Sequence, residues 1–362
     1  MTGSLAKRVY THPVLRGTII PALLLLLSPP FTLLTITTCQ TYGGDLLAAG
    51  RVALTAPAAL LAALPRPSWW ATGVLAAYTA VQYALLVLLP GRRFVAQLTP
   101  MGNRPMYRLN GVAAFVINVV AVVAAGRAGL LHPGVVYDRY GELLATAERH
   151  GGLSNGMAVS AAIQLLYIAK FFVWEAGYFN SIDITHDRFG FLICWGCLCW
   201  VPSVYTLPSM YMASRPVHLS AAGALGVLAL GVVSVAANYD ADRQRQRVRA
   251  TNGATTVWGK PPVLVHAKYV TGDGRHHNNI LLASGWWGQA RHVNYLSELM
   301  LALAWTLPAG FDHCTPYVYV AFLTVLLVDR AERDDLRCRT KYGSYWSDYC
   351  ARVPYSIVPY LY

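Results

Sequence analysis

Long runs of apolar residues, separated by short polar or basic connections, dominate the chain. The longest runs cover about residues 17–37, 47–65, 71–90, 111–131, 156–178, 191–213 and 219–238. Each run is close to the roughly 20 residues that a helix needs to cross the hydrocarbon core of a bilayer. Two shorter stretches, 296–308 and 315–328, flank the helix-breaking Pro308-Ala309-Gly310 and are expected to form one hairpin. The pattern predicts an all-α fold, a polytopic membrane helix bundle of about 8–10 transmembrane helices.

The chain changes character after residue 238. Residues 239–279 are polar, and the segment from Asp329 to Tyr362 is charged and aromatic. That last segment is too polar to cross a membrane, so we expect a cytosolic C-terminal tail that packs against the membrane domain. We therefore divide the chain into N-terminal transmembrane helices (1–155), central transmembrane helices (156–238) and a cytosol-facing C-terminal part with two short membrane helices (239–362).

Composition and charge support a membrane protein. Hydrophobic residues make up 55% of the chain and charged residues only 13%, about half of the charged fraction that soluble domains carry. This excludes a soluble enzyme, a disulfide-stapled secreted domain and a disordered scaffold. The net charge of +12 is explained by basic cytosolic flanks, so no nucleic-acid partner is expected. Cys194, Cys197 and Cys199 lie in one apolar run and are interpreted as structural thiols, with no metal site.

Several ionisable residues lie in or beside the apolar runs near residue 180. Glu175, Asp183, His186 and Asp187 precede the run that contains Tyr205. Charged groups at membrane depth are costly and are usually paired or functional. On a helix, Asp183, His186 and Asp187 share one face, which is compatible with a metal site. One histidine and two carboxylates are weak evidence for a metal, so we favour a substrate pocket or an internal ion-pair network over a metal site or an ordinary interfacial loop.

The polar segment after residue 238 holds a second candidate, a pair of arginines. Arg245 and Arg249 are four residues apart, so a helix would place them on one face. Two guanidinium groups on one face can bind a cluster of phosphates. The residues alone favour a simpler interpretation, in which basic residues only anchor the helix end on the cytosolic side.

The third candidate is the polar, aromatic stretch SGWWGQARHVNY at 284–295. An interfacial aromatic belt explains the tryptophans and the tyrosine, but it does not require the Arg, His and Asn beside them. No Gly-x-Gly-x-x-Gly follows a strand pattern, and no Walker A, Gly-x-Ser-x-Gly or His-Glu-x-x-His motif occurs. The residues therefore indicate a membrane enzyme or receptor with a cytosolic pocket suited to phosphate.

Long ordered stretches resemble the family of sterol reductases that saturate the carbon 14 or carbon 7 double bond, which includes the lamin B receptor. The resemblance is carried by DITHDRFGF (183–191), WVPSVYTLPSMY (200–211), SGWWGQARHVNYLSE (284–298), LLVDRAERDDLRCRTKYGSYWSDYCARVPY (326–355) and the terminal PYLY. Within the family, residues 174–206 and 238–262 are similar to the branch that acts at carbon 7, the latter especially to plant members. The chain departs from the family at Ser297-Glu298, where Gly-Asp is common.

The resemblance implies NADPH as the cofactor and a phosphate role for Arg245 and Arg249, which reverses the preference stated above. The implied cofactor-binding residues are Arg245, Arg249, Leu282, Trp287, Asn294, Tyr295, Arg330, Asp334, Cys338, Arg339, Thr340, Lys341, Tyr342 and Tyr349. Arg330 is expected to support Asp334. The substrate pocket is expected to contain Glu175, Asp183, His186, Asp187 and Tyr205.

The implied reaction is the addition of a proton and then a hydride across the 7,8 double bond of a sterol 5,7-diene, in the endoplasmic reticulum membrane. Tyr205 and Asp334 match the family's proton donors. A buried carboxyl raises its own pKa and can stay protonated, whereas a tyrosine begins near 10, so the sequence does not choose between them. The implied partners are a sterol and membrane lipid. The alternatives are a carbon 14 reductase, a non-catalytic sterol-binding protein and a membrane methyltransferase that uses S-adenosylmethionine.

Overall fold

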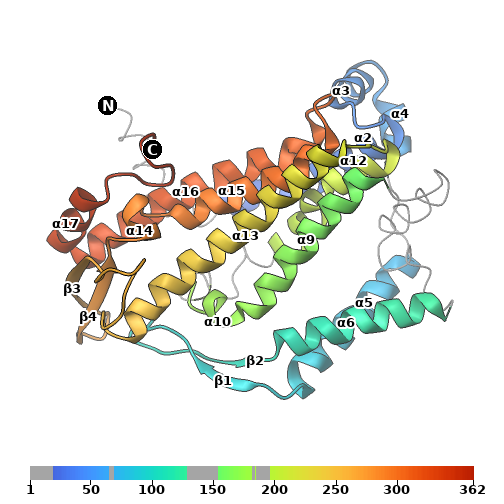
Figure 1. The fold of residues 1–362 in the computed structure, drawn as a ribbon. Coiled ribbons are helices and arrows are strands. Elements are labelled where there is room, and N and C mark those ends of the chain that lie inside the picture. The colour runs from blue at the N-terminus through green and yellow to red at the C-terminus, as the bar shows by residue number, and fades with distance from the viewer. Residues whose placement is uncertain (1–18, 65–68, 129–153, 182–183, 185–195) are drawn as a thin grey trace.

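The computed structural model describes residues 19–64, 69–128, 154–181, 184 and 196–362 (Figure 1). The N-terminal elements are α2 (Ile20–Thr41), α3 (Leu46–Thr55), α4 (Pro57–Ala63), α5 (Trp69–Leu88), β1 (Arg92–Val95), β2 (Met106–Leu109) and α6 (Gly111–Arg127). The run expected at 47–65 is broken into α3 and α4, because Pro57 cannot donate the hydrogen bond that would continue α3.

The remaining elements form the larger part of the molecule. They are α9 (Asn155–Val173), α10 (Glu175–Tyr178), the π-helix η3 (Gly196–Tyr205), α12 (Leu207–Ser214), α13 (Ala221–Ala250), β3 (Leu264–Val270), β4 (His276–Leu282), α14 (Trp286–Gln289), α15 (Val293–Thr306), the short 3-10 turns η4 (Leu307–Ala309) and η5 (Thr315–Tyr317), α16 (Val318–Tyr342) and α17 (Ser344–Arg352). Among the described residues, α2, α9 and α13 are long and apolar enough to cross a membrane. The all-α membrane class is confirmed.

The core of the molecule lies where α9, α13, α15 and α16 run side by side (Figure 1). Gly231 lets α13 approach α9 closely, since a Cβ atom there would lie 2.7 Å from the Ile163 side chain. Small residues at helix interfaces in membranes serve this purpose. Trp305 of α15 is 1% exposed at the centre of this packing. The bundle interior is therefore close-packed around aromatic side chains.

Two helices continue across the polarity changes at which the sequence analysis placed boundaries. α13 is capped by the Ser220 hydroxyl and runs past residue 238 to Ala250. α16 carries the apolar stretch from Val318 straight into the charged segment and ends before Gly343, whose φ is 56°. Neither residues 232–250 of α13 nor the whole of α16 contain Gly or Pro, so no residue interrupts the backbone hydrogen bonds where the side chains become polar.

Two antiparallel hairpins, which the sequence analysis did not predict, add to the helices. In the first, β1 pairs with β2, and in the second Leu264 of β3 faces Leu282 of β4. The second hairpin packs against α13, α16 and α17 at one end of the bundle (Figure 1). Polar and apolar residues alternate along β3, so one face of the strand is buried and the other exposed. This end of the bundle, called the polar end below, carries most of the expected cofactor residues.

Candidate functional site

The two arginines of interest lie on the inward side of α13. Arg245 and Arg249 are partly buried, while Arg243 and Arg247 on the same helix are exposed. The guanidinium carbon of Arg245 lies 4.0 Å from the centroid of the Trp287 ring, and its Nη2 is 3.2 Å from Asp242 Oδ1. The helical spacing of the sequence thus selects which two of the four arginines face the interior.

Trp287 holds the stretch 284–295 against α13. Its side chain is 3% exposed, and its Nε1 donates a hydrogen bond of 2.7 Å to the carbonyl oxygen of Ala241. Leu282, at the end of β4, packs with Trp287 and Val248 in one buried cluster. The Tyr349 hydroxyl donates to the Trp287 carbonyl at 3.5 Å. One tryptophan therefore joins α13, the second hairpin and α17.

Side chains of α16 and α17 complete this cluster. Cys338, Tyr342 and Tyr349 are buried, and all three lie near Arg249. Burial raises the pKa of the Cys338 thiol and of the Tyr342 hydroxyl to about 12, so both stay neutral at pH 7. The Tyr342 hydroxyl accepts a hydrogen bond of 2.7 Å from Asn279 Nδ2. We call the group formed by Arg245, Arg249, Trp287, Cys338, Tyr342 and Tyr349 the polar-end cluster.

Lys341 adds a further positive charge near this cluster. Its ammonium nitrogen lies 3.9 Å from the centroid of the Tyr269 ring. Burial, with Arg337 and Arg249 nearby, lowers the pKa of Lys341 to about 8. The group is therefore still mostly protonated at neutral pH, and a bound anion would favour the protonated form further.

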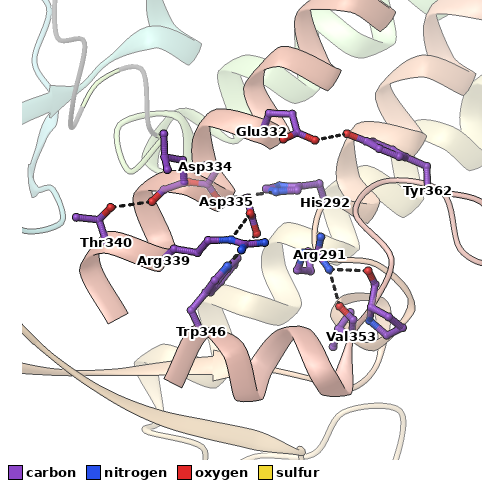
Figure 2. Close-up of polar contacts among 12 residues, drawn as sticks. Arg291, His292, Glu332, Asp334, Asp335, Arg339, Thr340, Trp346, Val353 and Tyr362 are labelled. Atoms are coloured by element: carbon purple, nitrogen blue, oxygen red, sulfur yellow. Dashed lines mark hydrogen bonds and ion pairs between the residues drawn. The ribbon is translucent and has the colours of Figure 1, made fainter. Parts of the chain in front are cut away.

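Asp334 is ionised in this arrangement. Burial by itself would raise the pKa of its carboxyl, but the ion pair with Arg337 and the neighbouring His292 hold that pKa below its ordinary value. His292 Nε2 is 3.9 Å from Asp334 Oδ2, and Figure 2 shows the imidazole directed toward this carboxylate. The observed ion-pair partner is Arg337, which the sequence analysis did not select. An ionised carboxylate cannot donate a proton, so the geometry favours a binding role for Asp334.

His292 was not among the expected site residues, although it lies within the polar, aromatic stretch 284–295. Its ring stacks on Tyr295, with centroids 4.9 Å apart. Burial, partly opposed by Asp334, lowers the pKa of His292 to about 4. The backbone N–H groups of Arg291 and His292 donate to the carbonyl oxygens of Tyr355 and Ser356 at 3.0 and 2.7 Å. Arg291 and His292 thus hold the C-terminal segment against the polar end. The sequence signal that could have identified His292 is its position beside an arginine within an otherwise aromatic stretch.

We expect the buried His292 to destabilise the protein in acid. The pKa is about 4 in the folded protein against an ordinary 6.5, so between these values the unfolded chain binds a proton that the folded protein does not. Stability contributed by the neutral form is therefore lost as the pH falls from 6.5 toward 4, by up to about 3 kcal/mol. Thermal unfolding midpoints in detergent across this range measure the loss. His292→Gln should flatten the dependence, while a change at the exposed His276 should not; equal slopes in all three proteins would contradict the assignment.

Three other expected cofactor residues lie on α16. Arg339 is 63% exposed and its Nε lies 2.6 Å from Asp335 Oδ2 (Figure 2). Thr340 is exposed and donates to the Leu336 carbonyl oxygen at 3.0 Å. These two side chains therefore lie outside the polar-end cluster. Arg330 is one helical turn before Asp334 on α16.

Tyr205 lies in the bundle interior, at the end of η3. Its ring is 8% exposed and packs against Trp305 at 5.0 Å, Tyr319 at 5.2 Å and Tyr167 at 6.5 Å between centroids. We call these four residues the tyrosine cluster. Tyr295, which stacks on His292, also packs against the buried residues around Tyr205. It connects the tyrosine cluster to the polar end.

Of the expected substrate residues, the structure describes Glu175 and Tyr205, and these two lie against different neighbours. Glu175 lies beside α6, where both carboxylate oxygens accept from the Gly111 N–H at 3.2 and 3.1 Å. It lines an apolar cleft of about 670 Å³ between α6 and the end of α9. Tyr205 instead contacts α9, α15 and α16. The remaining expected residues, Asp183, His186 and Asp187, lie outside the described residues.

The residues at the polar end fit a phosphate-bearing dinucleotide such as NADPH. Two guanidinium groups and the Lys341 ammonium supply positive charge, and Trp287 supplies an aromatic surface. Arg249 Nε and Asn294 Oδ1 are buried and have no hydrogen-bond partner among the described residues. Buried polar atoms in native proteins nearly always have a partner, so these two atoms indicate a place for a ligand.

Comparisons with known proteins identify the family that the chain resembles. The model of the "Ergosterol biosynthesis ERG4/ERG24 family" matches residues 143–362. The 7-dehydrocholesterol reductase of Arabidopsis thaliana is 38% identical over 373 residues, covering 82% of this chain and 86% of that protein. The Xenopus laevis protein of the same name is 41% identical over 215 residues, covering 59% of this chain and 46% of its own length. The Delta(14)-sterol reductase of Methylotuvimicrobium alcaliphilum is 30% identical over 368 residues, covering 82% of this chain and 84% of that protein.

Proposed function

The chain belongs to the ergosterol biosynthesis ERG4/ERG24 family, and from this premise we propose that it is an NADPH-dependent sterol reductase that saturates the 7,8 double bond of a sterol 5,7-diene. Its curated relatives are sterol reductases, which are oxidoreductases. The proposal for carbon 7 follows the Arabidopsis protein, whose similarity extends over 82% of this chain. The observation that carries the cofactor proposal is the inward pair Arg245 and Arg249 beside Trp287.

The polar-end cluster is proposed to bind and orient the cofactor. Arg245 and Arg249 would contact its phosphates, because the planar guanidinium group matches phosphate geometry. Asn294 and Asp334 would accept hydrogen bonds from its ribose or amide groups, since both present acceptor oxygens at this end. When bound, NADPH supplies the hydride. The basic residues at this end, among them Arg243 and Arg247, favour its placement on the cytosolic side of the endoplasmic reticulum membrane.

Tyr205 is the proposed proton donor. Protonation at carbon 8 of a 5,7-diene leaves a cation at carbon 7 that the 5,6 double bond delocalises, so it makes the ring accept hydride. A phenol hydroxyl can give this proton, whereas the ionised Asp334 cannot in its present environment. Trp305 and Tyr319 pack around Tyr205 and exclude water, which would otherwise capture the cation. Asp334 then serves in cofactor binding.

The substrate is identified by a direct assay. Purified protein in detergent is given NADPH with either a sterol 5,7-diene or a sterol 8,14-diene, and the sterols are separated by chromatography. We expect consumption of the 5,7-diene and an equal loss of NADPH absorbance. Consumption of the 8,14-diene alone would overturn the carbon 7 assignment in favour of the second candidate, a carbon 14 reductase, which the relative with 30% identity supports.

The same preparation tests the two candidates of other classes. Equilibrium titrations with NADPH and with S-adenosylmethionine measure which cofactor the protein binds. We expect NADPH to bind and S-adenosylmethionine not to bind. Binding of S-adenosylmethionine alone would indicate a methyltransferase, and sterol binding without turnover of either diene would indicate a non-catalytic sterol-binding protein.

A further inference from the structure

A polar network that the proposed cofactor site does not use crosses the interior between α9, α13 and α15. Lys170 Nζ donates a hydrogen bond to Asn238 Oδ1. Asn238 Nδ2 donates in turn to Glu298 Oε1 at 3.0 Å and to the Asn294 carbonyl oxygen at 3.1 Å. The Glu298 carboxyl also lies within hydrogen-bonding range of the Tyr167 hydroxyl. The network thus joins a cation, an amide, a carboxyl and a phenol.

The position of this network within the membrane domain requires an explanation. Lys170 belongs to α9 and Asn238 to α13, and both helices are long and apolar enough to cross a bilayer. Asn238 is 2% exposed. Lys170 lies near the end of α9 and Asn238 is the last residue of the apolar run of α13, so the network lies where the apolar helices meet the polar end. Ionisable groups that are buried in such a place are costly unless they are paired or functional. A purely structural contact between these helices would be made more cheaply by apolar side chains.

The network also lies between the two parts of the proposed active site. Glu298 is one helical turn after Asn294 on α15, and Asn238 binds both of these residues. Tyr167 belongs to the tyrosine cluster, with its ring stacked on Tyr205 at 6.5 Å and tilted on Trp305 at 5.7 Å. Glu298 is therefore connected to the cofactor side through Asn294 and, through Tyr167, to the aromatic rings that pack against Tyr205.

We infer that Glu298 supplies the proton that Tyr205 delivers, with Tyr167 as the intermediate carrier and Lys170 as the balancing charge. The inference rests on the proposed function, because it assigns the source of the proton for that same reduction. Glu298 does not contact the reacting carbons in this assignment, so it is a positioning and proton-supplying residue.

Each step of the relay balances. The electron pair of the 7,8 double bond takes the proton of the Tyr205 hydroxyl, forming the carbon–hydrogen bond and leaving a phenolate. The phenolate takes the proton of Tyr167, and Tyr167 takes the proton of the Glu298 carboxyl. The carboxylate left behind is stabilised by the Lys170 ammonium and is protonated again by water before the next turnover. Hydride from the cofactor of the proposed function completes the reduction, so one water proton is consumed in each cycle.

The charged and titratable groups that face Glu298 come from three neighbouring helices. They are Lys170 and Tyr167 on α9, Asp242 on α13 and Tyr319 on α16. Lys170 favours the carboxylate, while Asp242 opposes it. A change in the activity profile with pH is therefore assigned to Glu298 only if it disappears when Glu298 alone is made non-titratable.

The test compares Glu298→Gln with the wild type. Gln keeps the length of the side chain and an oxygen for Asn238, but it cannot donate a carboxyl proton. We expect kcat to fall by about 100-fold, with the affinity for NADPH, measured by fluorescence titration, unchanged. The decline of kcat as pH rises through the Glu298 titration should disappear. Infrared spectra of the protein without cofactor should lose a titrating carboxyl band in this variant.

A matched control separates chemistry from packing. Thr306→Val changes another buried polar side chain of α15, whose hydroxyl donates at 2.8 Å to the Ala302 carbonyl oxygen outside the network. It should leave kcat, its pH profile and the carboxyl band unchanged. If Glu298→Gln does not fold, Glu298→Asp provides the measurement, with an expected shift of the kcat profile and of the infrared titration.

The outcomes distinguish this inference from the proposed function. An inactive wild type that binds NADPH overturns the function, and the infrared titration then still decides whether Glu298 exchanges a proton. An active wild type with a Glu298→Gln variant of normal kcat overturns the relay alone. Equal losses in Glu298→Gln and Thr306→Val would also overturn it, because packing would then explain both.

Discussion

The double variant Arg245→Ala/Arg249→Ala should bind NADPH at least about 100-fold more weakly than the wild type. Each guanidinium group is expected to make a charge-assisted contact with phosphate, and the loss of one such contact costs about 1.5–3 kcal/mol. The two losses together correspond to about 3–6 kcal/mol if they add, which is a factor of about 10² to 10⁴. The preference for NADPH over NADH should also decrease, because the additional phosphate loses its partners. Fluorescence titration with both nucleotides measures these affinities.

The same helix offers a control for this experiment. Arg243→Ala/Arg247→Ala removes an equal charge from the exposed side of α13. It should leave the affinity for NADPH within about 3-fold of the wild type, because exposed charges are screened by salt. If both double variants lose affinity for NADPH equally, the overall positive charge of this helix end attracts the cofactor. The assignment of Arg245 and Arg249 to a specific phosphate site would then be wrong.

Tyr205→Phe should reduce turnover by about 100-fold or more while the affinity for NADPH stays unchanged. The substitution removes one hydroxyl and keeps the ring that packs against Trp305 and Tyr319, so the fold should persist. Loss of a positioned acid typically costs this much. Single-turnover kinetics at saturating cofactor measure the chemical step. Tyr317→Phe is the matched control, since its hydroxyl donates at 3.0 Å to the Gly310 carbonyl oxygen, outside the tyrosine cluster.

Asp334→Asn distinguishes the two donors implied by the family resemblance. The variant loses the charge that pairs with Arg337 and lies beside His292. If Asp334 serves in cofactor binding, the affinity for NADPH should fall together with turnover. A near-normal turnover of Tyr205→Phe, combined with an Asp334→Asn variant that binds NADPH normally but does not react, would transfer the acid role to Asp334.

The periodicity of the sequence correctly predicted those structural features that depend only on residues close together in the chain. The apolar runs predicted the helices and the membrane class, because burial in lipid requires a continuous apolar stretch. Arg245 and Arg249 share a face because helical geometry alone fixes residues four apart. The first hairpin was missed because β1 and β2 are only four residues each and carry little pattern. The second was missed although polar and apolar residues alternate along the seven residues of β3. The continuation of α13 and α16 was missed because a change in polarity was treated as the end of a helix.

Only the tertiary structure determined the contacts between residues far apart in the sequence and the protonation states that depend on those contacts. Burial of a carboxyl predicts a raised pKa, but at Asp334 the position of Arg337 reverses this result. Glu298 and Lys170 are separated by more than a hundred residues, and only the packing of α9, α13 and α15 places Asn238 between them. Glu175 and Tyr205 are expected in one pocket, yet Glu175 is bound by the first residue of α6, whereas Tyr205 packs against α15 and α16. The sequence by itself determined which side chains are available, because residue type and helical period are local properties. Only the fold determined their neighbours, because proton affinity and pairing depend on distances that no local pattern fixes.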